Sequence, residues 1–239
     1  MKPLLDAYFI QTHTGFTKEQ LPEYFENASV IEAYDYDNDG DLDVFIGSNS
    51  VSNNFGAIPN NYILQNNKGS FSLLKNKPFQ NIGMITDAIW EDYNSDGFTD
   101  LILVGEWMSP KFFVNKGGSF KEEKIIDSGL KGLWQQITPF DIDKDGDMDY
   151  LLGNWGKNSK FKATKKHPLR MYYADFDGNG STETILCNYK NGSYYPLLGL
   201  DELASQIVSL RKKFTTYKSM AGKSIDEIFE KSVLNKARI

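Results

Sequence analysis

The feature that most constrains this chain is a nine-residue acidic loop that occurs four times, at residues 35–43, 92–100, 141–149 and 175–183. We number these loops one to four. Each copy has oxygen-bearing side chains at positions 1, 3, 5 and 9 and a glycine at position 6. Because a recurring unit is the signature of a repeat architecture, we expect a fold built from several copies of one small element.

The spacing of the oxygen atoms indicates a bound cation. Side chains at positions 1, 3 and 5 can turn to one point when the chain curls, and the glycine permits a sharp reversal. Position 7 can contribute its backbone carbonyl as a further ligand, and position 9 contributes a carboxylate. Hard oxygen ligands in this number suit Ca²⁺ better than a softer metal. The alternative is that each stretch is an ordinary Asp-Gly turn, and four copies in phase favour calcium.

We therefore predict up to four Ca²⁺ ions, one in each of the four loops. The fourth loop is the most degenerate copy, because it contains an amide and a longer carboxylate side chain among its oxygens. The predicted metal ligands are Asp35, Asp37, Asp39, Asp41 and Asp43; Asp92, Asn94, Asp96 and Asp100; Asp141, Asp143, Asp145, Asp147 and Asp149; and Asp175, Asp177, Asn179 and Glu183.

An EF-hand does not explain these loops. It needs a glutamate at position 12 and a helix on each side. Position 12 is Ile46, Leu103 and Leu152 in the first three copies. Position 9 is followed instead by a short apolar run closed by glycine, at residues 44–47, 101–105 and 150–153. Such runs suit inner strands that are buried on both faces, so each loop should join two strands.

A second shared element completes the repeat. Residues 61–71 and 111–120 both read as a strand, an Asn/Lys/Gly turn and a second strand that begins with Ser-Phe, which predicts a β-hairpin. One unit is then strand, calcium loop, strand, connection and hairpin. The loops begin 57, 49 and 34 residues apart. Periods near this length, with several strands in each unit, are typical of propeller blades.

With these motifs the chain resembles the FG-GAP or VCBS repeat proteins, whose calcium loops lie in integrin-α-like β-propellers. It is most similar to the large secreted bacterial proteins that also carry an ASPIC/UnbV-type region, on stretches 86–90, 104–108 and 149–154. Residues 55–59 resemble a shortened Phe-Gly element. The resemblance covers residues 28–233 and implies about seven blades. Since fewer fit here, we expect a piece of a longer parent chain that supplies the remaining blades.

We therefore predict an all-β fold, a partial β-propeller of about three to four four-stranded blades, over residues 1–199. Residues 201–218 carry Leu203, Ile207, Leu210 and Phe214 on one helical face, and residues 224–227 form a capping box. Residues 200–239 are accordingly predicted to be a helical segment packed on the propeller.

Composition limits the function. The single cysteine, Cys187, excludes an internal disulfide and a cysteine-rich zinc site. No apolar run approaches the roughly 18 residues of a membrane span, and a net charge of −6 argues against nucleic acid. The resemblance implies an extracellular or cell-surface module that binds or scaffolds a protein or glycan ligand. The alternative is part of a propeller-type polysaccharide lyase or hydrolase, although no catalytic motif identifies an enzyme.

Two further features stay open at this point. Residues 157–170 contain six Lys or Arg and no acid, which fits either a polyanion contact or a solvated loop between blades. Trp107 and Trp155 fit either a ligand contact at the propeller rim or packing between blades. Cys187 follows two apolar residues and is predicted to be a small buried hydrophobe.

Overall fold

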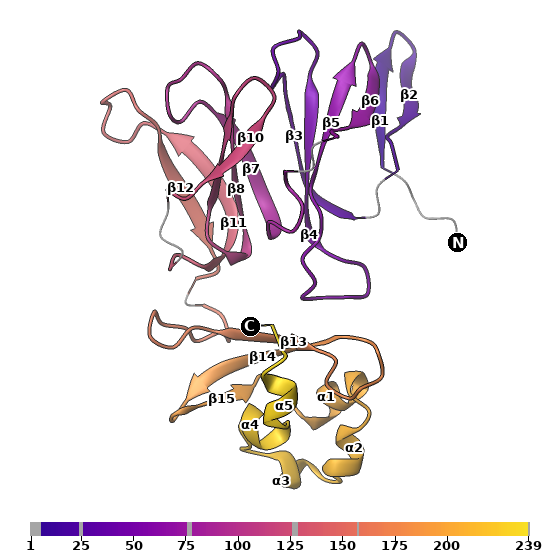
Figure 1. Ribbon diagram of the computed structural model, residues 1–239, viewed down its shortest axis with the longest axis vertical. Coiled ribbons are helices and arrows are strands. Elements are labelled where there is room, and N and C mark those ends of the chain that lie inside the picture. The colour runs from indigo at the N-terminus through magenta and orange to yellow at the C-terminus, as the bar shows by residue number, and fades with distance from the viewer. Residues whose placement is uncertain (1–5, 24–25, 76–77, 126–128, 157, 239) are drawn as a thin grey trace. The chain divides into compact units, whose positions relative to one another are not determined.

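The computed structural model describes residues 6–23, 26–75, 78–125, 129–156 and 158–238. The described chain is mostly antiparallel β structure with a few short helices, which confirms the all-β, partial propeller-like prediction (Figure 1). It divides into two compact units. The first comprises residues 1–49 and 58–154, and the second comprises residues 50–57 and 155–239.

The first unit begins with a hairpin and a four-stranded sheet. The hairpin pairs β1 (Ala7–Thr12) with β2 (Gly15–Gln20). The sheet has the strand order β3-β4-β5-β6, and loop one joins β3 to β4. This order of strand, loop, strand and hairpin is the one that the repeat predicted. The four strands are β3 (Asn27–Tyr34), β4 (Asp43–Ser50), β5 (Tyr62–Asn67) and β6 (Ser70–Leu73).

The next sheet repeats this plan around loop two. Strand β8 pairs with β7 and β9, and β9 pairs with β10, all antiparallel. Loop three then joins β11 to β12, and the start of β11 also pairs with the end of β8 at Gly132 and Met108. The strands are β7 (Met84–Glu91), β8 (Asp100–Met108), β9 (Lys111–Asn115), β10 (Phe120–Glu123), β11 (Gly132–Phe140) and β12 (Asp149–Asn154).

The inner strands β4 and β8 are buried on both faces, as their apolar runs predicted. The same prediction is wrong for residues 150–153 of β12, because Leu151 is 63% exposed where no further sheet of the described chain covers this strand. All four residues 101–104 of β8 have 0% of their surface exposed. Leu101 and Leu103 belong to one core cluster with Phe45 of the preceding sheet. Ile102 and Val104 belong to another cluster with Ile137 of β11. Because successive strand residues point to opposite faces, one strand contributes to two cores, and the sheets pack face to face like propeller blades.

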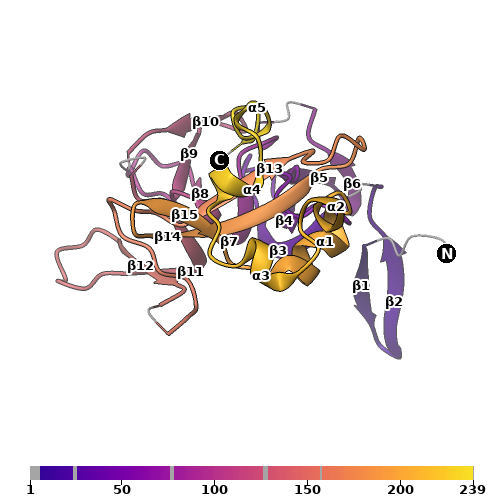
Figure 2. The same cartoon turned by 90° about the horizontal axis from the view of Figure 1, so that it is seen from below.

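The second unit combines a three-stranded sheet with helices. Loop four joins β13 (Arg170–Ala174) to β14 (Glu183–Lys190), and β14 pairs with β15 (Ser193–Pro196). The helices lie on one side of this sheet (Figure 1; Figure 2, seen from below). They are α1 (Leu200–Gln206), α2 (Leu210–Lys213), α3 (Tyr217–Met220), α4 (Ile225–Ile228) and α5 (Lys231–Leu234).

Sheet and helices in this unit share one hydrophobic core, in which Ile185 and Cys187 of β14 pack with Leu203 and Ile225. The four predicted helix-face residues are all buried. Residues 201–218 nevertheless form short helices rather than a continuous one. The backbone leaves helical geometry at Ile207. The side-chain oxygen of Thr216 caps α3 by accepting the N–H of Ser219.

Segment 50–57 belongs to the second unit, although it joins β4 to β5 in sequence. The Asn54 side-chain oxygen accepts hydrogen bonds from the hydroxyl groups of Tyr173 (3.0 Å) and Thr182 (2.9 Å). The Phe55 carbonyl accepts a further bond from the Thr184 hydroxyl. The Phe-Gly element therefore packs against the strands that flank loop four. The predicted domain boundary at residue 200 stays a prediction, since compactness alone does not define a domain.

No described helix combines the length and the apolar character that crossing a lipid bilayer would require.

Candidate metal centres

Loop one curls around the side chain at its first position. The Asp35 carboxylate accepts hydrogen bonds from the backbone N–H groups of Asp39 (3.1 Å) and Gly40 (3.0 Å). Gly40 has a φ of 93°, a left-handed conformation that favours glycine. The reversal brings carboxylate oxygens of Asp35, Asp37 and Asp39 within 4.8 Å of one another. The predicted convergence of positions 1, 3 and 5 is therefore present.

The ninth position of loop one lies beneath this cluster. Asp43 is 1% exposed, and its Oδ1 accepts the backbone N–H of Asn66 at 2.7 Å. Its Oδ2 is buried without a hydrogen-bond partner, as is Oδ1 of Asp37. Burial, reinforced by the charges of Asp37 and Asp39, raises the pKa of Asp43 to about 6. A buried carboxylate oxygen without a partner is costly, and a cation would remove that cost.

Loop two repeats this arrangement in most respects. Asp92 accepts the N–H groups of Asp96 (3.0 Å) and Gly97 (2.9 Å). Asp100 is 0% exposed, its Oδ1 accepts the N–H of Asn115 at 2.7 Å, and its Oδ2 is buried without a partner. Burial raises the pKa of Asp100 to about 6. The three acids of this loop do not converge as a group within 4.8 Å, in contrast to those of the other described loops.

Loop two differs from the other loops at position 3, where Asn94 stands in place of an aspartate, and the side-chain oxygen of Asn94 is engaged within the loop. This oxygen accepts the backbone N–H of Asp96 at 2.9 Å.

Loop three is more exposed to solvent than loops one and two. Its carboxylates of Asp141, Asp143 and Asp149 lie within 4.8 Å of one another. Asp149 is partly exposed and accepts the N–H of Ile142 at 3.0 Å.

Loop four is compact in spite of its degenerate sequence. The Asp175 carboxylate accepts the N–H groups of Gly178, Asn179 and Gly180 at 2.8–3.1 Å, and these bonds, chiefly that of Gly180, lower its pKa. Glu183 is 7% exposed, and burial raises its pKa. Asp175, Asp177 and Glu183 converge within 4.8 Å, and Oδ1 of Asp177 is buried without a partner.

Two asparagines that support the loops were not identified as site residues from the sequence. Asn115 is 0% exposed, and its Nδ2 donates to the carbonyls of Tyr36 (2.7 Å) and Thr99 (3.1 Å). It therefore ties loop two to loop one. Asn66 holds the equivalent place in the preceding hairpin and donates to the Leu42 carbonyl at 3.0 Å. The sequence does contain a signal for these residues, because each asparagine stands at the start of the Asn/Lys/Gly turn shared by the two predicted hairpins. The same pattern fits an ordinary hairpin turn, so it does not by itself indicate a metal-site residue.

The residues present fit a hard cation. The side chains that converge are carboxylates, which is the ligand chemistry of Ca²⁺. Seven buried side-chain oxygens of the described chain lack a hydrogen-bond partner, and four of them lie inside these loops. They belong to Asp37, Asp43, Asp100 and Asp177. The other predicted ligands lie in the same loops. At position 7 of loop one, Asp41 accepts the N–H of Lys68 at the surface.

The remaining sequence candidates have other surroundings. Cys187 is 0% exposed, and burial raises its thiol pKa to about 12, so it is the predicted buried hydrophobe. Trp107 lies at the end of β8 with a φ of 62°, unusual for a residue with a side chain. Trp155 stacks on Phe161 with ring centroids 5.5 Å apart.

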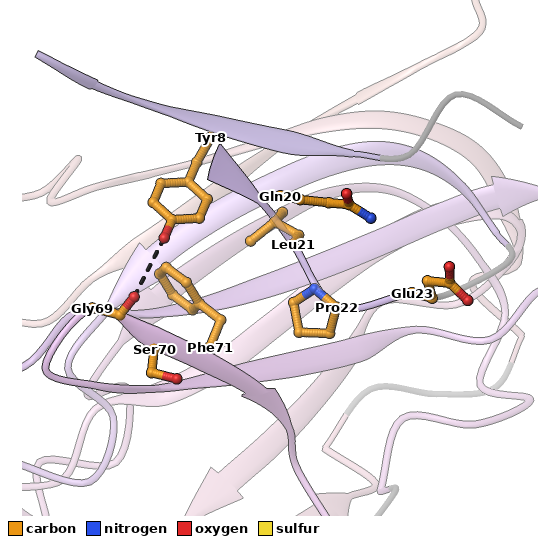
Figure 3. A pocket seen from close by; sticks show the side chains of 8 residues that line it. All are labelled: Tyr8, Gln20, Leu21, Pro22, Glu23, Gly69, Ser70 and Phe71. Atoms are coloured by element: carbon orange, nitrogen blue, oxygen red, sulfur yellow. Dashed lines mark hydrogen bonds between the residues drawn. The ribbon is translucent and has the colours of Figure 1, made fainter. Parts of the chain in front are cut away.

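A shallow pocket of about 500 Å³ lies between the β1–β2 hairpin and the β5–β6 turn (Figure 3). The Tyr8 hydroxyl donates to the Gly69 carbonyl at 3.3 Å across it. Glu23 is the one carboxyl group in its lining, so the described lining does not offer the pair of acids that glycoside hydrolysis needs. Its lining residues are Tyr8, Gln20, Leu21, Pro22, Glu23, Gly69, Ser70 and Phe71.

Comparison with known proteins agrees with the repeat geometry. The family model of the FG-GAP-like repeat matches twice, at residues 35–103 and 92–152. These matches contain loops one to three and strands β4 to β11. No curated protein and no solved structure matches the chain. The finer resemblance to VCBS and ASPIC/UnbV-type proteins stays a prediction. The chain is therefore an FG-GAP-like repeat protein over residues 35–152.

Proposed function

We propose that this chain is a calcium-stabilised β-propeller repeat region of an extracellular or cell-surface protein, where it acts as a binding or scaffold module for protein or glycan ligands. The observation that carries the proposal is the set of four buried, unpartnered carboxylate oxygens inside the loops. FG-GAP-like repeats often bind Ca²⁺ and are typical of extracellular proteins.

Electrostatics explains why a cation would stabilise this fold. Carboxylates 4.8 Å apart repel each other by roughly 3 kcal/mol per pair near a protein surface. Three of the loops bring three carboxyl groups to that separation. Bound Ca²⁺ supplies the opposite charge and a partner for the unpaired oxygens. The loops connect the inner strands, so metal binding would hold the sheets in place.

The experiment is a calcium titration of thermal stability. The protein is first stripped with a chelator and then melted over a range of Ca²⁺ concentrations, with Mg²⁺ as the matched control. Each filled site should add about 2.7 kcal/mol at 100 times its dissociation constant. A melting temperature that Ca²⁺ does not raise more than Mg²⁺ does would contradict the proposal.

The open sheets also support the prediction that a longer parent chain supplies further blades. Phe9 and Phe16 of the β1–β2 hairpin are 62% and 70% exposed, and Leu151 of β12 is 63% exposed. Propeller blades normally cover such side chains with a neighbouring blade. We propose that these faces meet further blades in the parent protein.

The enzyme alternative gains no specific support. A lyase or hydrolase needs an acid, a base and a cationic group that converge outside the calcium loops. Among the described carboxyl groups outside the loops, Glu32 has a raised pKa, caused by burial and then by the charge of Asp87. One such group does not make an acid–base pair. The proposal is accordingly limited to binding and scaffolding.

A further inference from the structure

The two compact units carry opposite charges. The second unit contains 15 Lys or Arg and eight Asp or Glu, a formal charge of +7. The first contains 11 Lys or Arg and 24 Asp or Glu, a formal charge of −13, and together they give the −6 of the chain. The acidity of the whole chain therefore hides a strongly basic unit. Such asymmetry favours a polyanionic partner for the basic part.

The charge gathers around residues 155–156 and 158–170, which we name the basic aromatic loop. Its described part has no acid. Four lysines of the loop have exposed side chains. They are Lys160, Lys162, Lys165 and Lys166.

The loop is fixed to the sheet of its unit. The backbone N–H of Lys162 donates to the Asn188 side chain at 3.3 Å, and that side chain donates back to the Lys160 carbonyl at 3.2 Å. Thr164 and His167 exchange two backbone hydrogen bonds of 2.9 and 3.1 Å. Because these contacts hold the backbone, less conformational entropy is lost when a ligand binds than for a free tail.

Flat aromatic faces alternate with the lysines. Trp155 stacks on Phe161, with 21° between the rings, and keeps 49% of its surface exposed. His167 stacks on Tyr189 with ring centroids 3.7 Å apart. Arg170 lies over the Tyr194 ring at 3.9 Å, so it holds the end of the loop and is not a free guanidinium at the surface.

We propose that the basic aromatic loop binds an anionic polysaccharide. The exposed indole face of Trp155 offers an apolar surface for the C–H face of a pyranose ring. Lysines are flexible point charges, which suit carboxylate or sulfate groups spread along a sugar chain. Nucleic acid or an acidic protein is disfavoured, because planar bidentate contacts use arginine and the arginine of this loop is engaged with Tyr194. The inference rests on the proposed binding function and names its ligand class.

The test measures binding of the full, calcium-saturated chain to immobilised chondroitin sulfate by interferometry. Neutral dextran, poly(dT) and polyglutamate are the comparison ligands. The test variant is K160Q/K165Q/K166Q. The matched control is K212Q/K218Q/K236Q, which removes the same charge from exposed lysines in the helical part of the same unit. Trp155→Ala tests the aromatic contact.

We expect salt-sensitive binding to chondroitin sulfate, a roughly tenfold loss at about 0.1 M salt in the loop variant, and little change in the control variant. Trp155→Ala should weaken binding to chondroitin sulfate more than binding to polyglutamate. Equal losses in both lysine variants would overturn a local site. Tighter binding to poly(dT) or polyglutamate than to chondroitin sulfate would overturn the assignment of a glycan ligand. The absence of binding to chondroitin sulfate would overturn the local site as well as its glycan ligand.

These outcomes are separate from those of the proposed calcium role. Calcium-dependent melting without chondroitin sulfate binding would refute the basic aromatic loop and leave the calcium sites standing. Chondroitin sulfate binding by a chain whose melting temperature does not respond to calcium would refute the calcium role and leave the basic aromatic loop standing.

Discussion

Replacing Asp100 with asparagine should have opposite effects with and without calcium. The side chain is 0% exposed, and its Oδ1 accepts the N–H of Asn115, a bond that asparagine can keep with its own oxygen. Oδ2 is buried without a partner. In chelator, the substitution removes an uncompensated buried charge. In calcium, it removes a ligand.

The magnitude follows from the pKa of Asp100, which burial raises from 3.8 to about 6. At pH 7 the ionised folded state then carries a penalty of up to about 3 kcal/mol. In chelator, Asp100→Asn should raise the melting temperature by up to about 6–10 °C. In saturating calcium, the variant should lose the stabilisation that one bound ion contributes. That stabilisation is about 2.7 kcal/mol when the free Ca²⁺ concentration is 100 times the dissociation constant.

The pH dependence has a definite sign. Because the folded pKa lies above the unfolded value, the penalty is absent below pH 3.8 and complete above about pH 6. In chelator, the parent should therefore gain stability relative to Asp100→Asn as the pH falls from 7 to 5. The assay is thermal melting at both pH values with and without calcium. Glu19→Gln, an exposed charge change on β2, is the control. Destabilisation of Asp100→Asn by the same amount in chelator and in calcium would refute the reasoning.

Four further results are expected. Asn115→Ala should cost about 2–3 kcal/mol in urea unfolding, because buried carbonyls of Tyr36 and Thr99 lose their donor; a cost below about 0.5 kcal/mol would contradict this. Cys187 should react with a thiol reagent only on unfolding, since it is 0% exposed and its pKa is raised to about 12; rapid labelling of the native protein would contradict its burial. Asp143→Ala should reduce the calcium-dependent rise in melting temperature more than Asp177→Ala, because loop three supplies more carboxylates; equal reductions would refute this ranking. The isolated chain should self-associate in light scattering because its outer sheets expose large apolar side chains, and a monodisperse monomer at high concentration would argue against open faces.

The elements that local pattern determines could be predicted from the sequence. Loops one and two curl as expected because position 1 accepts the N–H groups of positions 5 and 6, and glycine stands where the backbone needs a positive φ. The burial of residues 101–104 on both faces followed from an unbroken apolar run. These features depend on residues close together in the chain.

Features that depend on distant partners could not be predicted. Asn115 links two loops through a carbonyl that lies 79 residues away in sequence, while its own local pattern indicates only a turn. The apolar spacing of residues 201–218 predicted the buried face correctly, but a side-chain cap at Thr216 competes with a continuous helix. The charge of the second unit became visible only when the compact units were known.

The central claim is that the acidic loops bind calcium, and the most direct measurement is the binding stoichiometry. Isothermal titration of the chelator-stripped chain with Ca²⁺ should show saturable binding of up to four ions, one for each loop. The carboxylate-to-asparagine change at Asp100 should remove one of them, and Glu19→Gln should remove none. Absence of saturable binding, or a stoichiometry that Asp100→Asn leaves unchanged, would contradict the account.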